Sequence, residues 1–227
     1  MASVGNRVNE VMPAHPDPAV LEVLAAAPVA NIGDVMQRLY SPDAGIRALN
    51  AHRLAGPAVT VRVPTGDNLV IHAVMDSLRP GDVLVVDAEG STARAVMGDL
   101  MLQYLATKGI AGVVVDGCVR DLDYIAGECP FAVYARGTNP NGPYKNGPGE
   151  INYPVAIGGV VVNPGDLVCG DADGIVVVPA AEAAAVAEET AAVVAKEGRI
   201  SERIRSEGVF DRPWVDAQMA RIGSVSI

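Results

Sequence analysis

The chain has few aromatic residues, few cysteines and no cluster of basic residues. Phe, Trp and Tyr make up 4% of its 227 residues, so large aromatic side chains cannot dominate the core. The three cysteines are odd in number and show no CxxC spacing, which argues against a disulfide framework and against a zinc site. We therefore interpret them as reduced thiols of a cytosolic protein.

Long apolar runs are also missing, and acidic residues outnumber basic ones. The apolar runs are short and interrupted by Gly, Pro or Asp, and the first residues show no apolar signal core. A formal net charge of −10 without a basic face argues against nucleic-acid binding. We expect a soluble, cytoplasmic protein with no nucleic-acid and no membrane partner. An acidic protein that binds an anion must concentrate a few cations locally, so arginines beside loops are site candidates.

The sequence has enough apolar material for a full core. Half of the residues are hydrophobic, and the length suits one compact domain with additions. Within this single domain we expect an N-terminal helical region at 1–56, a sheet core at 57–180, and a C-terminal helix and tail at 181–227.

Hydrophobic periodicity predicts alternating strands and helices, which is typical of an α/β protein. Strands are expected at 58–63, 83–87, 112–116 and 132–134. Helices are expected within 17–40, after a cap at Asp67-Asn68, near 99–108, and within 181–207. Residues 137–154 are rich in Gly, Pro and Asn and show no periodicity, so they form a functional loop, an interface element or a mobile segment.

One stretch of sequence is repeated. The Pro-Gly-Asp turn, short strand and acidic turn of residues 80–90 recur at 164–174. A repeated β-turn solution is the favoured interpretation, and a shared catalytic role is the alternative.

The segment from Asp99 to Asp121 carries most of the functional information. It predicts a short helix, a buried strand at 112–116 and a loop in which Gly117 permits a sharp turn before Arg120 and Asp121. Open α/β sheets bind ligands outside the carboxyl ends of their strands. There an aspartate can hold a hard divalent cation, and a guanidinium can bind a carboxylate or stabilise an enolate oxygen. Taken alone, an Arg-Asp pair is more often an exposed ion-paired turn, and its setting after a buried strand favours a functional role.

The start of the helix near 99–108 adds further candidates. Asp99 is either a first-turn acid that complements the helix dipole or a functional carboxylate. Gly98 before it would let a ligand approach the backbone. The N–H groups of Leu100, Met101 and Leu102 could then bind an anion.

The arrangement of Asp99, twenty further residues, Arg120 and Asp121 resembles that of the class II 4-hydroxy-4-methyl-2-oxoglutarate/4-carboxy-4-hydroxy-2-oxoadipate aldolases, which are grouped with the RraA-like proteins. Further similar segments lie at 68–72, 79–87, 98–101, 115–121, 154–159, 164–166 and 171–179. The resemblance implies an RraA-like α/β fold. We expect a β/β/α sandwich of the swivelling-domain type, with a central mixed sheet, N-terminal helices and a C-terminal helix.

The resemblance also implies a lyase that cleaves a carbon–carbon bond of a 4-hydroxy-2-oxo acid to release pyruvate. Such enzymes also decarboxylate oxaloacetate, since both reactions pass through a metal-stabilised pyruvate enolate. By position, Asp121 would bind Mg²⁺ or Mn²⁺, Arg120 would stabilise the enolate, and Asp99 would orient or ionise a water for proton transfer. The backbone of Gly98, Leu100 and Met101 would bind the pyruvyl carboxylate. A Lewis-acid metal needs no Schiff-base lysine.

By the same resemblance the protein would form a homotrimer or a hexamer with its active site at the subunit interface. A carboxylate from the neighbouring C-terminal region would then complete the site, with Glu197 as first candidate and Glu202 as second. His72 is either an acid/base near the site or a structural histidine.

Two other functions are alternatives to this hypothesis. A non-catalytic RraA-type regulator of a ribonuclease would use the acidic surface to bind basic segments, but Asp99 and the long C-terminal helix favour the enzyme. A methyltransferase would need a glycine-rich loop after the first strand and an acidic ribose-binding residue, and we discount it. The loop at 139–147 departs from the aldolase pattern, so the identity of the substrate stays open.

Overall fold

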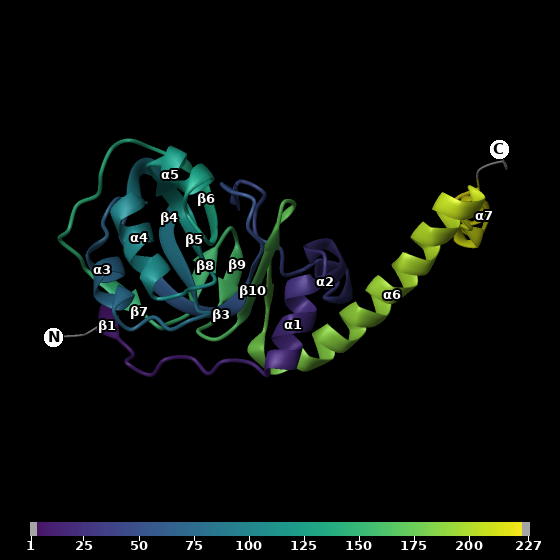
Figure 1. Ribbon diagram of the computed structural model, residues 1–227, viewed down its shortest axis with the longest axis horizontal. Coiled ribbons are helices and arrows are strands. Elements are labelled where there is room, and N and C mark those ends of the chain that lie inside the picture. Colours follow the sequence, from purple (N-terminus) through teal and green to yellow (C-terminus); the bar gives the residue numbers. More distant parts are fainter. Residues whose placement is uncertain (1–3, 224–227) are drawn as a thin grey trace. The chain divides into compact units, whose positions relative to one another are not determined.

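The computed structural model describes residues 4–223, and these residues form a mixed α/β structure (Figure 1). The strands are β1 (Asn6–Val8), β2 (Arg47–Ala48), β3 (Leu54–Arg62), β4 (Val83–Met97), β5 (Gly112–Val119), β6 (Ala132–Thr138), β7 (Gly149–Ile151), β8 (Val155–Ile157), β9 (Val160–Val162), β10 (Leu167–Asp171) and β11 (Gly174–Val178). The helices are α1 (Pro18–Ala26), α2 (Val29–Val35), α3 (Leu69–Met75), α4 (Asp99–Thr107), α5 (Leu122–Gly127), the 3-10 turn η1 (Ala180–Glu182), α6 (Ala183–Glu207) and α7 (Pro213–Arg221).

The main sheet is mixed, as expected. Its strands follow the order β1-β7-β3-β4-β5-β6-β2, and β10 pairs with both β3 and β11. The central strands β3, β4, β5 and β6 run parallel to one another, while β2, β7 and β10 pair antiparallel with the central strands. Because the carboxyl ends of the parallel strands lie at one edge, loops that follow them meet there.

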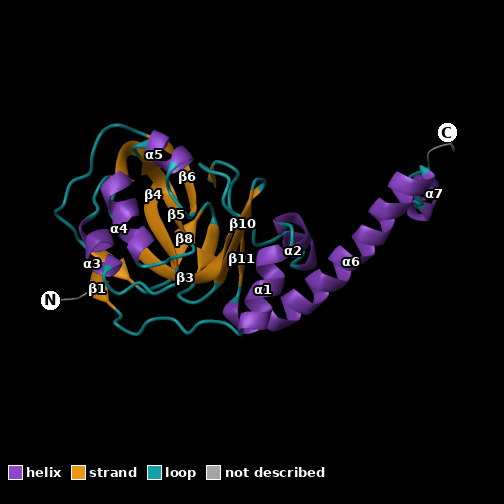
Figure 2. Cartoon of the chain, in the orientation of Figure 1, coloured by secondary structure: helices purple, strands orange, loops and turns teal. Residues whose placement is uncertain are grey.

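Two apolar layers enclose the central strands, which explains why β5 is apolar at nearly every position. One face packs against α3, α4 and α5, with Val86, Val115 and Leu102 in the same cluster (Figure 2). The opposite face packs against the β8–β9 hairpin through Val85 and Val114. A third cluster joins α1, α2 and the start of α6 to β10 and β11.

Several predicted boundaries were wrong. The strand expected at 83–87 continues to Met97, because residues after Glu89 and Gly90 pair with β5 through shifts in register. The strand expected to end at 116 continues to Val119, so Gly117 lies in β5 and makes no turn. A Cβ atom on Gly117 would lie 2.9 Å from the Cβ of Ala88, so glycine allows close packing there. The loop at 137–154 contains the end of β6 and all of β7.

The expected start of α3 and the repeated turn are confirmed, whereas Asn31 and Asp34, expected as caps of a second N-terminal helix, lie inside α2, which begins at Val29. Asp67 accepts the Leu69 N–H at 2.9 Å in front of α3. The repeated segments share one turn: Asp82 accepts the Arg79 N–H and Asp166 accepts the Asn163 N–H, each at 2.8 Å and three residues back. The repeated sequence therefore forms the same β-turn twice, which is the interpretation that was favoured above.

The chain forms two compact units, the first ending at Thr190 and the second beginning at Ala191. The second unit holds the later part of α6 and α7, and it exposes apolar side chains, including Phe210 at 52% and Trp214 at 64%. The expected single domain with regions at 1–56, 57–180 and 181–227 stays a prediction.

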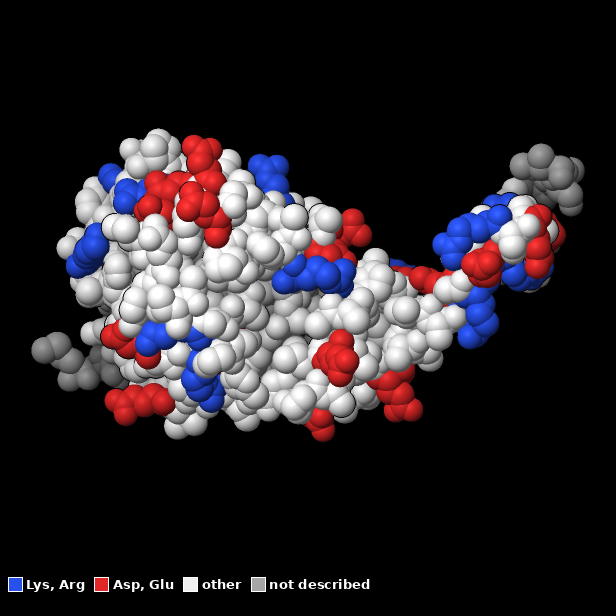
Figure 3. All heavy atoms as spheres, in the orientation of Figure 1, with Lys and Arg blue, Asp and Glu red and all other residues white. Residues whose placement is uncertain are grey.

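On the face in Figure 3, basic side chains lie singly or in small groups among acidic ones. No single helix in residues 4–223 is long and apolar enough to cross a membrane; α1 and α2 pass that test together but are bent by 113°.

Candidate active site

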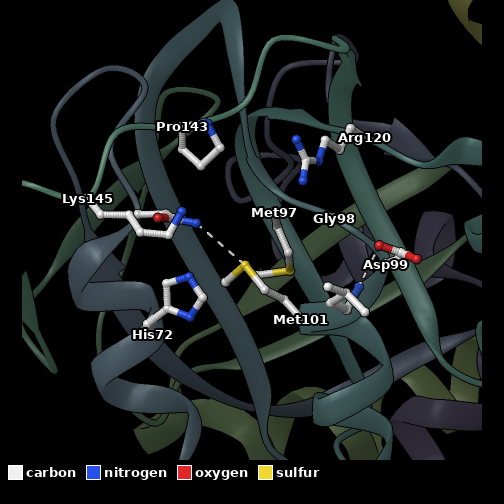
Figure 4. Close-up of a pocket in the computed structure, with 10 residues that line it drawn as sticks. His72, Met97, Gly98, Asp99, Met101, Arg120, Pro143 and Lys145 are labelled. Carbon is white, nitrogen blue, oxygen red and sulfur yellow. Dashed lines mark hydrogen bonds between the residues drawn. The ribbon is translucent and has the colours of Figure 1, made fainter.

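A cavity of about 220 Å³ opens where β4 leads into α4 and where β5 ends (Figure 4). Its lining comes from α3, the β4–α4 junction, the end of β5 and the loop before β7: Asn68, His72, Met97, Gly98, Asp99, Leu100, Met101, Arg120, Pro143 and Lys145. The structure therefore brings together all the site residues expected from 72 to 120. Figure 4 shows His72 and Lys145 on one side of the cavity and Asp99 and Arg120 on the other.

Arg120 and Asp121 are fixed in the turn between β5 and α5. The Arg120 N–H donates to the Met97 carbonyl at 2.9 Å, which ties the end of β5 to the end of β4. Asp121 has φ 64° and ψ 51°, a left-handed conformation that is uncommon for residues other than glycine. This backbone directs the Asp121 carboxylate toward the start of α4, where its Oδ2 accepts the Asp99 N–H at 2.9 Å. Arg120 Nε lies 3.5 Å from the same oxygen.

Gly98 makes room for these two side chains. Its φ of −146° is ordinary extended backbone, so its conformation does not require glycine. A Cβ atom at this position would collide with the Asp121 carboxylate and would lie 2.9 Å from Arg120 Nε and 3.0 Å from Arg120 Cγ. Glycine is needed here because side chains of the protein, and not only a ligand, approach the backbone.

Two of the three N–H groups expected to bind an anion already have acceptors. Leu100 donates to the Asp99 carboxylate at 2.7 Å, and Leu102 donates to the Gly98 carbonyl at 3.1 Å. The Met101 N–H has no protein acceptor among residues 4–223. An anion at the start of α4 would therefore meet the Met101 N–H first and would have to displace Asp99 to reach Leu100.

The donor set for a metal ion is small. Within residues 4–223, no group of three or more His, Cys, Asp or Glu side chains is arranged to hold a metal. Mg²⁺ commonly binds through one or two carboxylates, with waters and substrate oxygens completing its shell. Asp121 fits this mode: its side chain is 38% exposed, and its hydrogen bond to Asp99 uses one of two oxygens.

Sequence reasoning missed four lining residues: Asn68, Met97, Pro143 and Lys145. Asn68 occupies the expected N-cap position of α3 but makes no side-chain capping bond; its Nδ2 donates to the Val96 carbonyl at 3.0 Å. Asn68 is only 2% exposed, and its buried Oδ1 has no hydrogen-bond partner within residues 4–223. A buried acceptor without a donor is costly, so a cavity ligand that supplies a donor would be favoured there.

Lys145 belongs to the loop whose composition had indicated a functional segment. On the same side of the cavity, burial and then the nearby Lys145 charge lower the pKa of His72 below its usual value of 6.5. The imidazole is therefore held neutral at neutral pH.

Glu197 and Glu202 lie on α6 in the second unit, so the carboxylate expected from a neighbouring subunit stays a prediction.

The mixed sheet, with a cavity at the carboxyl edge of its parallel strands lined by Asp99 and Arg120, defines an α/β protein. The RraA-like model, described as Aldolase/RraA, matches residues 29–177. The chain belongs to this family.

Several known proteins are similar over most of the chain. A protein of Halalkalibacterium halodurans named "Putative 4-hydroxy-4-methyl-2-oxoglutarate aldolase" is 39% identical over 185 residues, which covers 81% of this chain and 85% of that protein. An uncharacterized protein from Pseudomonas syringae pv. tomato has a similar structure, with a TM-score of 0.77 at 28% identity, over 88% of this chain and 98% of that one. RraAS2 of Streptomyces coelicolor, described as an unusual member of the RNase ES inhibitor RraA family, gives a TM-score of 0.73 at 32% identity, over 84% and 98% of the two chains.

Proposed function

We propose that the protein is a divalent-metal-dependent class II pyruvate aldolase that cleaves a 4-hydroxy-2-oxo acid, of the 4-hydroxy-4-methyl-2-oxoglutarate type, to pyruvate. The observation that carries the proposal is that Asp99 and Arg120 line the cavity and that Asp121, directly behind them, contacts both. Asp121 Oδ2 accepts the Asp99 N–H at 2.9 Å and lies 3.5 Å from Arg120 Nε. The name of the 39% identical relative supports the same reaction.

Asp121 would hold the metal, Mg²⁺ or Mn²⁺. Once bound, such an ion supplies Lewis-acid polarisation of a keto oxygen and needs no covalent intermediate with a lysine. Carboxylate oxygen suits both ions, and the exposed edge of Asp121 leaves room for water and substrate oxygens.

Arg120 would stabilise negative charge on the pyruvyl half of the substrate. Its guanidinium points into the cavity in Figure 4, and its side chain is 44% exposed. A fixed cation beside a developing enolate oxygen is worth more in the transition state than in the ground state, since charge increases at that oxygen. Arg120 Nε is held 3.5 Å from Asp121 Oδ2, so its position is set before substrate binds.

Asp99 would hold a water that delivers a proton to C3 of the pyruvate enolate. Its carboxylate is anchored at both oxygens, by the Leu100 N–H at 2.7 Å and by Gln103 Nε2 at 3.4 Å. Anchoring keeps the carboxylate at the cavity edge, where a bound water can be oriented.

The other half of the substrate would lie toward Asn68 and Lys145. Lys145 offers a cation to a second carboxylate. Asn68 Oδ1, which no donor in the described part of the chain reaches, offers an acceptor to a hydroxyl. A 4-hydroxy-2-oxo dicarboxylate carries both groups, so it matches both ends of the cavity. We extend the proposal to oxaloacetate decarboxylation, because that reaction passes through the same enolate.

The proposal includes a homotrimer or hexamer, with Glu197 of a neighbouring subunit near the site. It is supported by the apolar side chains that α6 and α7 expose beyond Thr190. The second candidate function is regulation of a ribonuclease by protein binding, and it is favoured by the similarity to RraAS2.

Release of pyruvate, coupled to lactate dehydrogenase, tests the reaction. Purified protein with Mg²⁺ or Mn²⁺ should release pyruvate from 4-hydroxy-4-methyl-2-oxoglutarate and from oxaloacetate. Arg120→Ala should lower kcat by about 100-fold or more, the usual scale for losing a donor that stabilises a developing oxyanion. Arg47→Met, which removes an exposed arginine on β2, is the matched control and should retain activity. Wild-type activity in Arg120→Ala would refute the site, and a lack of metal-dependent pyruvate would favour the regulator.

A further inference from the structure

Pro143 and Lys145 line the cavity, and the segment that carries them, residues 142–146 (the wall), is held by a charged side chain that does not line it. Arg94, on β4, donates from Nη1 to the Gly142 carbonyl at 3.0 Å and from Nη2 to the Tyr144 hydroxyl at 2.9 Å. Its guanidinium carbon also lies 4.4 Å from the centroid of the Tyr144 ring. One arginine therefore fixes the residues on both sides of Pro143.

A second charged group holds the other end of the wall. The buried Asp67 carboxylate accepts the Asn146 N–H at 2.7 Å through Oδ2, while its Oδ1 accepts the Leu69 N–H at 2.9 Å. Burial alone would raise the pKa of Asp67, but the N–H donors of Leu69, Asn146 and Gly147, together with the Lys145 charge, lower it. Asp67 thus stays ionised and joins the start of α3 to the residue after Lys145.

The backbone between these two contacts is paired as well. Tyr144 donates its N–H to the Gly66 carbonyl at 2.8 Å, and Asn68 donates its N–H to the Tyr144 carbonyl at 3.1 Å. Gly66 has φ +71°, and a Cβ there would lie 2.8 Å from the Arg94 Cδ, so the stem of Arg94 packs directly on this turn. The two contacts therefore belong to one connected arrangement.

As a consequence, the backbone that carries the exposed side chain of Lys145 is fixed on both sides. Lys145 lies between Tyr144, held by Arg94, and Asn146, held by Asp67. A free loop would have to be ordered when an anion binds, and the entropy lost would weaken affinity. A fixed backbone removes much of that loss and keeps Lys145 at the cavity.

We propose that Arg94 and Asp67 are positioning residues that set the preference of the cavity for a substrate with a second carboxylate. They act through Lys145 and do not touch the substrate. This inference rests on the proposed function, since it assigns Lys145 to the half of the substrate that is not pyruvyl.

A matched pair of ligands tests the inference without turnover. The compounds 2-oxoglutarate and 2-oxovalerate have five carbons each and differ by a carboxylate in place of a methyl group. We expect wild-type protein with Mg²⁺ to bind 2-oxoglutarate about tenfold more tightly by isothermal titration calorimetry, as one charge-assisted contact would give. In Arg94→Met the preference should fall below about threefold, with the Kd for 2-oxovalerate unchanged within about twofold.

Companion variants separate positioning from folding. Arg94→Lys keeps the stem on Gly66 and the charge but loses the planar pair of donors, so an intermediate preference is expected. Asp67→Asn should also reduce the preference, and Arg47→Met should leave it unchanged. If Arg94→Met does not fold, Tyr144→Phe removes one acceptor of Arg94 and should reduce the preference partially.

The outcomes distinguish this inference from the proposed function. A wild-type preference that persists in the Arg94 and Asp67 variants would overturn it, and so would an equal loss of affinity for both ligands. A wild-type protein with no preference between the two ligands would overturn it as well. A preference that collapses in the variants supports the inference even where wild-type protein releases no pyruvate, a result that refutes the aldolase alone.

Discussion

The Asp99 backbone N–H donates a 2.9 Å hydrogen bond to the carboxylate of Asp121, which lies 22 positions further along the chain. The bond joins the start of α4 to the turn after β5, and Gly98 leaves the space in which it forms. Because Asp121 adopts a left-handed backbone conformation to reach this position, the arrangement of the site depends on an uncommon local geometry.

A methyl group at Gly98 should therefore damage catalysis more than folding. In Gly98→Ala the Asp121 carboxylate and the Arg120 side chain must both move, and misplacement by about 1 Å can cost about 100-fold in rate. We expect kcat for pyruvate release to fall on that scale. Gly127→Ala is the matched control, because a Cβ there meets nothing within 4 Å. Activity of Gly98→Ala within a few-fold of this control would argue against the arrangement.

The charge of Lys145 should be visible in the titration of His72. Burial and Lys145 lower the pKa of His72, so its midpoint followed by NMR should lie below 6.5. Lys145→Met should raise that midpoint, while Lys108→Met, a change of equal charge elsewhere, should not. An unchanged midpoint in Lys145→Met would show that the lysine does not face His72.

The lowered pKa of His72 should also make the folded protein less stable as the pH falls. With its pKa lowered in the folded state, His72 binds fewer protons when folded than when unfolded. Its contribution to stability is complete above the unfolded pKa and is lost as pH falls through the folded value. We expect His72→Gln to weaken the decline in stability between neutral and mildly acidic pH, measured by urea unfolding at several pH values. A decline as steep as in wild-type protein would contradict this.

Asp82 should contribute to stability and not to catalysis. Its buried carboxylate accepts the Arg79 N–H at 2.8 Å and lies 2.8 Å from His15 Nε2. Hydrogen bonds to charged groups contribute about 1.5–3 kcal/mol, so Asp82→Ala should lower the free energy of unfolding by roughly 3 kcal/mol. The exposed Asp123→Ala should change it by less than about 0.5 kcal/mol. Equal values for the two variants would contradict the assignment.

The parts of the site that sequence predicted are those fixed by local pattern. The apolar run of β5 and the helix near 99–108 place Arg120 and Asp99 at the carboxyl edge of the sheet without any knowledge of distant contacts. The continuation of β4 to Met97 was missed, because its polar residues after Glu89 carry no strand signal and depend on pairing with β5.

Lys145 illustrates what local pattern cannot show. Its place in the cavity depends on Asp67 and Arg94, which lie more than 40 positions away in the sequence and hold the loop through side-chain hydrogen bonds. Composition indicated that the loop has a role, but only the packed chain shows which of its side chains line the cavity.

Exchange of the methyl protons of pyruvate in D₂O, followed by NMR, tests the central claim most directly, because it requires enolate formation at the pyruvyl site and nothing of the distal half. With Mg²⁺ or Mn²⁺, wild-type protein should catalyse exchange, chelation of the metal should abolish it, and Asp121→Asn should slow it by about 100-fold or more. Absence of metal-dependent exchange in wild-type protein, or an undiminished rate in Asp121→Asn, would contradict the account.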